Sequence, residues 1–409
     1  MHILYIHQYF ATLSNSSGTR SYEFARRLVQ SGHEVTMLTS NSNLQLLFRE
    51  GEDEIRETSV DGIRVLVINE SVNNRTSFGK RLTSFSSFAR KATRLGMKVS
   101  CDCVFATSTP LTVAYPALRI SKTKKIPMIF EVRDIWPDVP IELGIIKNPI
   151  LKWLSRRLEM KAYKFAKRII ALSFDMKNNI VGKGIPADKI VVIPNASDNE
   201  IFDSVSSVEL EKFQEEYPIF RERKVVLYAG TIGMVNGLKY MVELAAEAIK
   251  HSQKVAFVII GDGREREEVI GYAKSLKVFD RNLFVFPPMP KNRVICAMKA
   301  ATIHTSFVIN KEVLWANSAN KFFDALAASK PIVINYGGWQ SEVLMENDAG
   351  ILLPPDSPVE GARRILELIN NWTKYHNMCE NAKRIAVTLY DRNTLFKRLD
   401  NVITESSNS

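Results

Sequence analysis

Short apolar runs alternate with stretches of helical periodicity from the first residues of the chain. Residues 2–7 and 34–39 are predicted strands, and apolar side chains recur at helical spacing over residues 21–31 between them. Gly32 follows that helix at the position typical of a C-cap glycine. A strand, a loop, a helix and a second strand with such short connections form a βαβ unit, so the pattern predicts a parallel sheet.

The same alternation continues along the chain with one interruption. Further strands are predicted at residues 62–67, 102–106, 127–132, 168–172 and 190–193, with helices at 76–99, 150–166 and 177–181. Between residues 197 and 223 the periodicity weakens, which indicates a domain junction that contains one helix. The pattern then restarts, with strands at 225–227, 255–260, 283–286, 302–304 and 332–334 and helices at 238–248, 265–276, 293–299 and 390–403. The predicted fold class is α/β, with two similar parallel sheets facing one cleft.

Residues 315–342 combine a small-residue loop, a helix and a buried strand. The loop is residues 317–320, an amphipathic helix follows it, and Pro331 ends the helix before the strand. The N–H groups at the start of such a helix can bind an anion, and Lys321 and Asp324 share its first turns. This arrangement suits a phosphate-bearing ligand with sugar hydroxyl groups. An ordinary amphipathic helix with an aspartate in its second turn is the alternative.

Composition narrows the class of protein. A chain of 409 residues, of which 45% are hydrophobic and 24% charged, is expected to form two or three soluble domains. It lacks the run of about 18 apolar residues that a membrane span requires, and its first residues lack the features of a signal peptide. Cys101, Cys103, Cys296 and Cys379 have no zinc-binding spacing, so we expect reduced thiols in a cytoplasmic protein.

The net charge of +11 is concentrated in two stretches, residues 75–98 and 147–168. A basic surface of this kind can bind nucleic acid, an anionic membrane or a phosphorylated substrate. The sequence has no recognised nucleic-acid-binding motif, so we expect no nucleic-acid partner. In the first stretch phenylalanines lie beside the cations, which suits a helix in a membrane interface. Packing of the apolar side of that helix on the sheet is the alternative.

Several common catalytic and nucleotide-binding motifs are absent from the sequence. It has no P-loop, no G-x-G-x-x-G fingerprint, no H-E-x-x-H, no clustered metal ligands and no G-x-S-x-G elbow. Glycine loops at predicted strand ends can instead hold a phosphate without a metal ion, with arginine or lysine adding fixed charge. The glycines concerned are Gly18 and Gly230, and the cations are Arg20, Arg264 and Lys321. For each cation alone, a solvated surface position is the alternative.

An ordered set of short segments resembles glycosyltransferase family 4. The segments are the Gly18–Arg20 loop, GHEVTMLTS (32–40), RDIWPD (133–138), IPNASDNEIF (193–202), YAGTIG (228–233), GDG (261–263) and SANKFFDALAASKPIV (318–333). The resemblance extends over nearly the whole chain. It is greatest to the bacterial branch that builds O-antigen, capsule and exopolysaccharide, which includes the WbuB-like N-acetylfucosamine transferases.

The resemblance implies a GT-B fold, in which two Rossmann-like domains hold the active site between them. Residues 1–200 would bind the acceptor, together with a crossover helix at 388–405, and residues 201–387 would bind the nucleotide sugar. Asp324 matches the second carboxylate of the family's Glu-x7-Glu motif, which holds the nucleotide ribose. The other implied donor-binding residues are Gly18, Thr19, Arg20, Asn195, Gly230, Thr231, Gly263, Arg264, Ser318, Asn320 and Lys321.

The sequence departs from the family pattern in three respects. The first glutamate of the Glu-x7-Glu motif falls at Ala316, so the identity of the donor sugar stays open. Asn236 stands where a phosphate-binding lysine is common. The histidine of the family's catalytic region has no clear counterpart, and Asp134 is the nearest polar candidate for a catalytic residue.

The resulting hypothesis is retaining, metal-independent sugar transfer. The donor would be a UDP-linked sugar, such as N-acetylfucosamine, and the acceptor a polyprenyl-diphosphate-linked saccharide at the inner face of the cytoplasmic membrane. No cofactor is expected. One alternative is a sugar-nucleotide 2-epimerase. Another is an inactive GT-B protein that binds sugar nucleotide or scaffolds a membrane assembly, which Ala316 favours.

Overall fold

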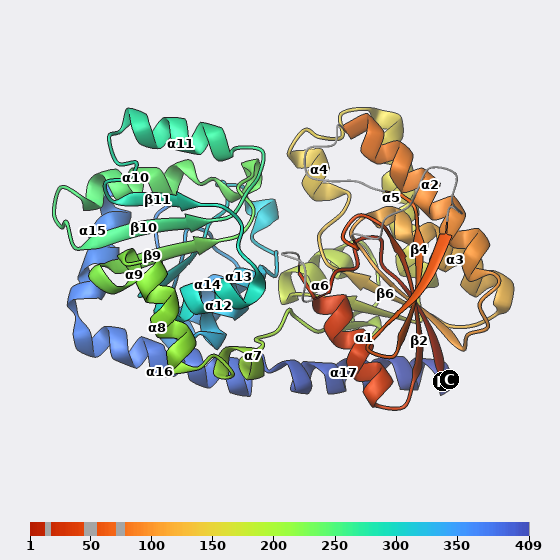
Figure 1. Cartoon of the computed structure of the whole chain (residues 1–409). Coiled ribbons are helices and arrows are strands. Elements are labelled where there is room, and N and C mark those ends of the chain that lie inside the picture. Colours follow the sequence, from red (N-terminus) through yellow and green to blue (C-terminus); the bar gives the residue numbers. More distant parts are fainter. Residues whose placement is uncertain (13–17, 45–54, 71–77, 409) are drawn as a thin grey trace. The chain divides into compact units, whose positions relative to one another are not determined.

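The structure is a computed structural model that describes residues 1–12, 18–44, 55–70 and 78–408. The chain forms two compact units (Figure 1). The first contains Met1–Pro194 and Asn393–Ser409, and the second contains Asn195–Arg392. Each unit is an α/β domain with a largely parallel sheet, which confirms the fold class that the alternation of apolar runs and helices predicted.

The sheet of the first unit has eight strands in the part of the chain that the structure describes. They are β1 (His2–Ile6), β2 (Glu34–Ser40), β3 (Ile55–Val60), β4 (Ile63–Ile68), β5 (Cys103–Thr107), β6 (Met128–Val132), β7 (Arg168–Ala171) and β8 (Ile190–Val192). Their order is β3-β4-β2-β1-β5-β6-β7-β8, and all neighbours pair in parallel except β3 and β4. The strand order reverses between β1 and β5, where open α/β sheets bind ligands beyond the strand ends.

Helices accompany this sheet. They are α1 (Arg20–Gln30), α2 (Phe78–Gly96), η1 (Leu111–Val113), α3 (Ala114–Lys124), α4 (Asp138–Glu142), α5 (Pro149–Phe165), α6 (Phe174–Gly182), η2 (Ala187–Lys189) and α17 (Arg392–Asn408). In α2 the side chains of Phe85, Phe88 and Ala92 are buried, and the helix contacts β2, β4 and α3. Of the two alternatives for the basic, phenylalanine-containing stretch, the structure therefore shows packing on the sheet.

The second unit has a six-stranded sheet in which every neighbouring pair is parallel. Its strands are β9 (Lys224–Ala229), β10 (Val255–Ile260), β11 (Leu283–Phe286), β12 (Ile303–Ser306), β13 (Ile332–Ile334) and β14 (Gly350–Leu352). The order β11-β10-β9-β12-β13-β14 is that of a Rossmann fold. The order reverses between β9 and β12, so the loops that follow these two strands border the expected ligand position.

In the described part of the chain, the second unit has more helices than the sequence predicted. They are α7 (Asn199–Asp203), α8 (Ser207–Glu216), α9 (Ile219–Glu222), η3 (Met234–Asn236), α10 (Lys239–Ala248), α11 (Arg266–Ser275), α12 (Lys291–Ala300), η4 (Glu312–Leu314), α13 (Asn320–Ala327), α14 (Trp339–Asn347), α15 (Pro358–Asn370) and α16 (Trp372–Thr388). The first three occupy residues 197–223, so the prediction of one helix there was wrong. These helices are short, and residues 197–223 therefore show no sustained apolar period.

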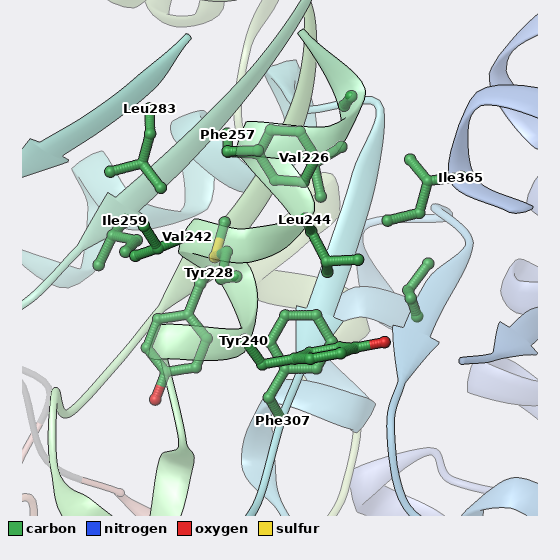
Figure 2. Close-up of a cluster of buried hydrophobic side chains, with 14 of the residues drawn as sticks. Val226, Tyr228, Tyr240, Val242, Leu244, Phe257, Ile259, Leu283, Phe307 and Ile365 are labelled. Atoms are coloured by element: carbon green, nitrogen blue, oxygen red, sulfur yellow. The ribbon is translucent and has the colours of Figure 1, made fainter. Parts of the chain in front are cut away.

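A buried cluster between β9, β10 and α10 forms the core on one face of the second sheet (Figure 2). Val226, Phe257 and Leu244 are fully buried in it. Tyr240 meets the ring of Phe307 edge to face at a centroid distance of 5.4 Å. This core packs against β9 and β10, and so it fixes the carboxyl ends from which the two loops leave.

Two further observations concern the sequence predictions on membrane and redox state. In the described part of the chain, no helix has both the length and the apolar character needed to cross a bilayer. All four cysteines are free thiols.

Candidate functional site

Two glycine loops lie together at the carboxyl edge of the second sheet. The Gly230 N–H donates to the Ile260 carbonyl at 2.9 Å, and the Ile232 N–H donates to the Asp262 carbonyl at 2.9 Å. A Cβ at Gly263 would lie 2.1 Å from the Ile232 carbonyl oxygen, so this contact requires glycine. The loops that follow β9 and β10 therefore form one continuous surface of backbone.

The predicted residues Thr231 and Arg264 are both exposed on these two loops. The Thr231 carbonyl accepts hydrogen bonds from the Tyr228 hydroxyl at 2.7 Å and from the Asn236 side-chain amide at 2.9 Å. Asn236, which stands where a lysine is common in the family, thus stabilises the loop through a hydrogen bond to its backbone. Arg264 supplies a positive charge at the exposed edge of the second loop.

Lys321 joins the loop after β9 to the start of α13. Its Nζ lies 4.9 Å from the centroid of the Tyr228 ring, and a Cβ at Gly230 would lie 2.7 Å from its Cε. Burial lowers the pKa of Lys321 to about 8, whereas the nearby Asp324 carboxylate raises it. Lys321 is therefore mostly protonated at neutral pH. It stands in the first turn of a helix whose N-cap residue, Ala319, provides no side-chain cap.

Asp324 follows one turn later and lies within a cluster of charges. Burial is the main cause that raises the pKa of Asp324 to about 6. Lys291 is the strongest charge that opposes this increase, whereas Asp198 raises the pKa further. Arg392 and Lys321 oppose the increase more weakly. Asp198 is itself paired with Arg392 and lies 3.5 Å from Lys291 Nζ, so those cations neutralise Asp324 only in part.

Asn195 and Ser318, which belong to motifs 123 residues apart, meet beside α13. The Asn195 N–H donates to Ser318 Oγ at 3.1 Å, and its side-chain amide donates to the Ser318 carbonyl at 2.6 Å. Ser197 Oγ donates to the Phe323 carbonyl at 2.9 Å. Asn195 and Ser318 are buried, so they hold the loop that opens α13 in place. Asn320, by contrast, is exposed at the first position of the helix.

A pair of polar groups beside Ala316 was not predicted from the sequence. The Trp315 ring packs on Gly337, where an added Cβ would lie 3.0 Å from it. The Trp339 indole N–H donates to the Asn317 carbonyl at 2.9 Å. Among the described residues, the buried Trp315 Nε1 and Asn317 Oδ1 have no hydrogen-bond partner. One donor and one acceptor thus flank Ala316 in the chain, and two tryptophans near a glycine pair were the available sequence signal.

Arg20 is buried inside the first unit, with 2% of its side chain exposed. Its Nε and Nη2 donate to Glu131 Oε1 at 3.0 and 2.9 Å. Its other N–H groups donate to the carbonyls of Ile193 and Pro194. The guanidinium also lies 4.4 Å from the centroid of the Phe24 ring. Arg20 therefore joins α1 to β6 and to the end of β8, and we assign it no contact with a ligand.

Gly18 and Thr19 lead directly into α1. The Thr19 carbonyl accepts the N–H of Glu23 at 2.8 Å, and the Thr19 side chain is buried. The sequence SNSS at residues 14–17, which precedes Gly18, lies outside the described residues.

A second polar group lies at the carboxyl edge of the first sheet. His7 Nδ1 lies 2.7 Å from Ser21 Oγ, and the Arg133 guanidinium lies 3.3 Å from His7 Nε2. Burial, followed by the Arg133 charge, lowers the pKa of His7 well below its usual value, so the imidazole is neutral. Arg133 can then donate to Nε2, and Nδ1–H donates to Ser21. The predicted catalytic residue Asp134 is exposed and accepts the Thr109 hydroxyl at 2.6 Å.

The second unit thus brings together the chemistry that a sugar nucleotide requires. Backbone N–H groups and Lys321 suit a diphosphate, and Asp324 suits a pair of hydroxyl groups. In the described part of the chain, no group of three or more His, Cys, Asp or Glu side chains could hold a metal ion.

Two family models match the chain. Residues 17–200 match the model described as Glycosyltransferase Family 4, and residues 209–385 match Glycosyl transferases group 1. The putative colanic acid biosynthesis glycosyl transferase WcaI of Escherichia coli (strain K12) is 23% identical over 201 residues, which are 48% of this chain and 48% of WcaI. The chain therefore aligns with about half the length of that relative. The alpha-D-kanosaminyltransferase of Streptomyces kanamyceticus is 22% identical over 76% of this chain and 78% of its own.

Solved structures share the fold over the full chain. HepE of Anabaena, determined in complex with UDP, has a TM-score of 0.73 at 16% identity and covers 99% of this chain and 100% of its own. WaaG, a glycosyltransferase involved in lipopolysaccharide biosynthesis, has a TM-score of 0.68 at 15% identity and covers 98% of this chain and 99% of its own. At these identities the likeness establishes the architecture of two parallel-sheet domains.

Proposed function

The chain belongs to glycosyltransferase family 4, and we propose that it transfers a sugar from a UDP-linked donor to a lipid-linked saccharide. In this proposal the configuration at the sugar carbon is retained, no metal ion is required, and the lipid is a polyprenyl diphosphate. The product belongs to a bacterial surface polysaccharide such as O-antigen or capsule, made at the inner face of the cytoplasmic membrane. WcaI and WaaG, whose names refer to colanic acid and lipopolysaccharide biosynthesis, support this product class.

The observation that carries the proposal is the convergence of three backbone segments in the second unit. The loops that contain Gly230 and Gly263 pack together, and Lys321 at the start of α13 contacts the first of them. The Gly230 loop follows β9 and α13 comes after β12, and the strand order reverses between these two strands, which is the usual ligand position in such sheets. The donor diphosphate would bind to their N–H groups, to Lys321 and to Arg264. HepE, which has the same fold, binds UDP, and this supports a uridine nucleotide here.

Two further groups would select the rest of the donor. Asp324, when ionised, would accept hydrogen bonds from the ribose hydroxyl groups. Trp315 Nε1 and Asn317 Oδ1 are buried and unpartnered beside Ala316, among the residues that the structure describes. An N-acetylated amino sugar, such as N-acetylfucosamine, offers an amide carbonyl to the first and an amide N–H to the second. This match is the reason to propose such a sugar where the family's carboxylate is missing.

Catalysis would come from stabilising the departing diphosphate. As the bond from the sugar carbon to the diphosphate oxygen breaks, negative charge grows on UDP. Lys321 and the helix N–H groups are fixed before the reaction, so they stabilise that charge with little reorganisation. In the first unit, Asp134 would orient the acceptor hydroxyl, with Thr109 holding its carboxylate.

A donor screen tests this proposal. The purified protein would be given UDP-, GDP- and dTDP-sugars in EDTA, with a membrane extract that supplies lipid-linked acceptor. We expect acceptor-dependent release of UDP and arrival of one sugar in the lipid fraction. Asp324→Asn should abolish most of this activity, whereas Asp203→Asn, at an exposed site in the same unit, should retain it.

Two outcomes would contradict the proposal. Loss of all activity in EDTA, with recovery on adding Mg²⁺, would show that the reaction needs a metal ion. Tight binding of UDP-sugar without release for any donor would favour the inactive sugar-nucleotide-binding protein, for which Ala316 is the strongest argument.

A further inference from the structure

Large apolar side chains are exposed on one part of the first unit, around α4 and the start of α5. Both helices are labelled in Figure 1. Ile150 is 66% exposed, Trp153 57%, Leu154 48% and Ile145 43%. Ile150, Trp153 and Leu154 follow each other at spacings of three and four residues, so they share one face of α5. Exposed apolar residues at helical spacing, within little more than one turn, leave a contiguous apolar surface that water solvates poorly.

The same face of α5 becomes basic in its later turns. Arg157, Lys161 and Lys164 continue the spacing from Ile150 and Leu154, and all three are exposed. The Arg157 guanidinium lies 5.2 Å from the centroid of the Trp153 ring, so the two parts of the face are in contact. We name this face, Ile150, Trp153, Leu154, Arg157, Lys161 and Lys164, the α5 face.

No acidic side chain offsets the charge of the α5 face from within its own helix. The only acidic residue in the α5 sequence, Glu159, is buried and paired with Lys183. Ala162 and Tyr163, on the opposite side of α5, are buried in the unit. The helix is therefore anchored by one side, and its other side presents cations and apolar groups together.

We propose that the α5 face binds the surface of an anionic phospholipid bilayer. Tryptophan and branched aliphatic side chains at one end of a basic helix can insert at the level of the headgroups, while arginine and lysine contact lipid phosphates. Nucleic acid would use the cations and leave Ile150 and Leu154 in water. The choice of a bilayer as the occupant rests on the proposed function, because the proposed acceptor is a lipid.

The α5 face differs from the surface that the sequence favoured for this purpose. In α2, Phe85 and Phe88 are buried against the unit, so that helix has little apolar surface to insert. In α5 the apolar residues point outward and the chain around them is well anchored. Asn148 caps the helix by accepting the N–H groups of Ile150 and Leu151 at 2.8 and 3.2 Å.

Vesicle co-sedimentation of the full chain tests this inference. The vesicles are phosphatidylcholine alone or mixed with phosphatidylglycerol, with neither donor nor acceptor present, so the result does not depend on transferase activity. We expect binding to the anionic vesicles that weakens with salt. Removing two charges in Arg157→Gln/Lys161→Gln should weaken it roughly 25-fold, since each cation near an anionic surface contributes about fivefold. Trp153→Ser/Leu154→Ser should weaken it by at least tenfold.

Matched controls are available in the second unit. Trp372→Ser removes a tryptophan that is 70% exposed, more than Trp153 at 57%, and Lys374→Gln/Lys383→Gln removes two exposed cations from one helix. Both should bind vesicles like the unaltered chain. Quenching of tryptophan fluorescence by bromine-labelled lipid should fall in Trp153→Phe, which is too mild a change to unfold α5.

Several results would overturn the inference. They are absence of binding to anionic vesicles at low salt, equal binding by the α5 variants, equal loss in the controls, or tighter binding to nucleic acid than to vesicles. Failure of the donor screen with intact vesicle binding would contradict only the proposed function. Transfer activity on a water-soluble acceptor without vesicle binding would contradict only the α5 inference.

Discussion

At the scale of single residues, the chain handles its buried charges in two ways. Arg20 contacts the Glu131 carboxylate, two backbone carbonyls and an aromatic ring, so groups within the first unit neutralise its charge. Lys321 and Asp324 are only partly neutralised, and burial moves the pKa of each toward neutrality, to about 8 and about 6. Groups perturbed in this way are typical of binding sites, whereas a saturated ion pair is typical of structure.

Substitution of Arg20 should therefore affect stability rather than donor binding. Arg20→Met leaves Glu131 charged and buried without its partner, which should lower the free energy of unfolding by about 3–5 kcal/mol. Urea denaturation measures this loss. The double variant Arg20→Met/Glu131→Gln should recover part of it, because no lone charge is then buried. A stable Arg20→Met protein with weakened UDP binding would instead return Arg20 to the donor site.

The two titrating groups predict a pH dependence of donor binding. Affinity should fall below pH 6, as Asp324 becomes protonated, and above pH 8, as Lys321 loses its charge. Calorimetric titration with UDP from pH 5 to pH 9 checks both the acidic and the basic fall in affinity. Asp324→Asn should remove the acidic limb and weaken binding about 10- to 100-fold, since a hydrogen bond to a charged group is lost.

Asp324→Asn should also make the protein more stable at pH 7.5. The raised pKa means that the folded state binds more protons than the unfolded state between about pH 4 and pH 6, so stability falls as pH rises through that range. Removing the carboxylate relieves this cost. Because Asp324 is partly exposed, we expect a gain of about 1 kcal/mol rather than the full value of the shift. Unchanged or lower stability in urea would show that burial does not penalise this carboxylate.

At the scale of elements, the candidate site depends on loops that pack backbone against backbone. The loops after β9 and β10 approach closely at two glycines of the second loop. A Cβ at Gly261 would lie 1.9 Å from a carbonyl oxygen of the first loop, and a Cβ at Gly263 would lie 2.1 Å from another. The helix α13 then contacts the first loop through Lys321. A change in one of these elements should therefore displace the others.

Gly263→Ala tests this coupling between the loops. The added methyl group overlaps the Ile232 carbonyl, so the loops must separate, and we expect UDP affinity to fall at least tenfold with a loss of stability of about 1–3 kcal/mol. Gly271→Ala is the matched control. It lies inside α11 with no atom within 4 Å of the new Cβ, and it should raise stability by up to about 1 kcal/mol. Equal UDP affinity in both variants would show that the loops do not position the donor.

The elements also show what could be predicted from the sequence and what could not. The strands β1, β2, β9 and β10 are buried along nearly their whole length, so their continuous apolar runs were predicted correctly. The antiparallel strand β3 alternates in exposure and was missed. Gly230, Thr231, Gly263 and Lys321 were predicted as site residues because motifs place them at strand ends. Trp315, Asn317 and His7 were not, because their significance depends on contacts that only the tertiary structure creates.

At the scale of the whole molecule, the first unit is discontinuous in sequence. The part of α17 that begins at Asn393 belongs with Met1–Pro194, although the whole second unit separates them along the chain. Arg27 donates to the Asn393 side chain at 2.8 Å, and His33 lies 2.9 Å from Asp400. The periodicity of residues 390–403 predicted a helix but gave it no partner, because a packing surface 366 residues away leaves no local signal.

The stability of the first unit should therefore depend on the last helix of the chain. Leu399 is fully buried in α17, so Leu399→Ala should lower the free energy of unfolding by about 2–5 kcal/mol through lost burial and a cavity. Hydrogen exchange followed peptide by peptide locates the effect. Amides of β1 and β2 should exchange faster, whereas those of β9 and β10 should be unaffected, because α17 beyond Arg392 belongs to the first unit. Lys397→Ala, at an exposed position of the same helix, should change stability by less than about 0.5 kcal/mol.

Faster exchange of the β9 and β10 amides in Leu399→Ala would mean that α17 stabilises the second unit. Unchanged exchange in both units would mean that the first unit folds without this helix.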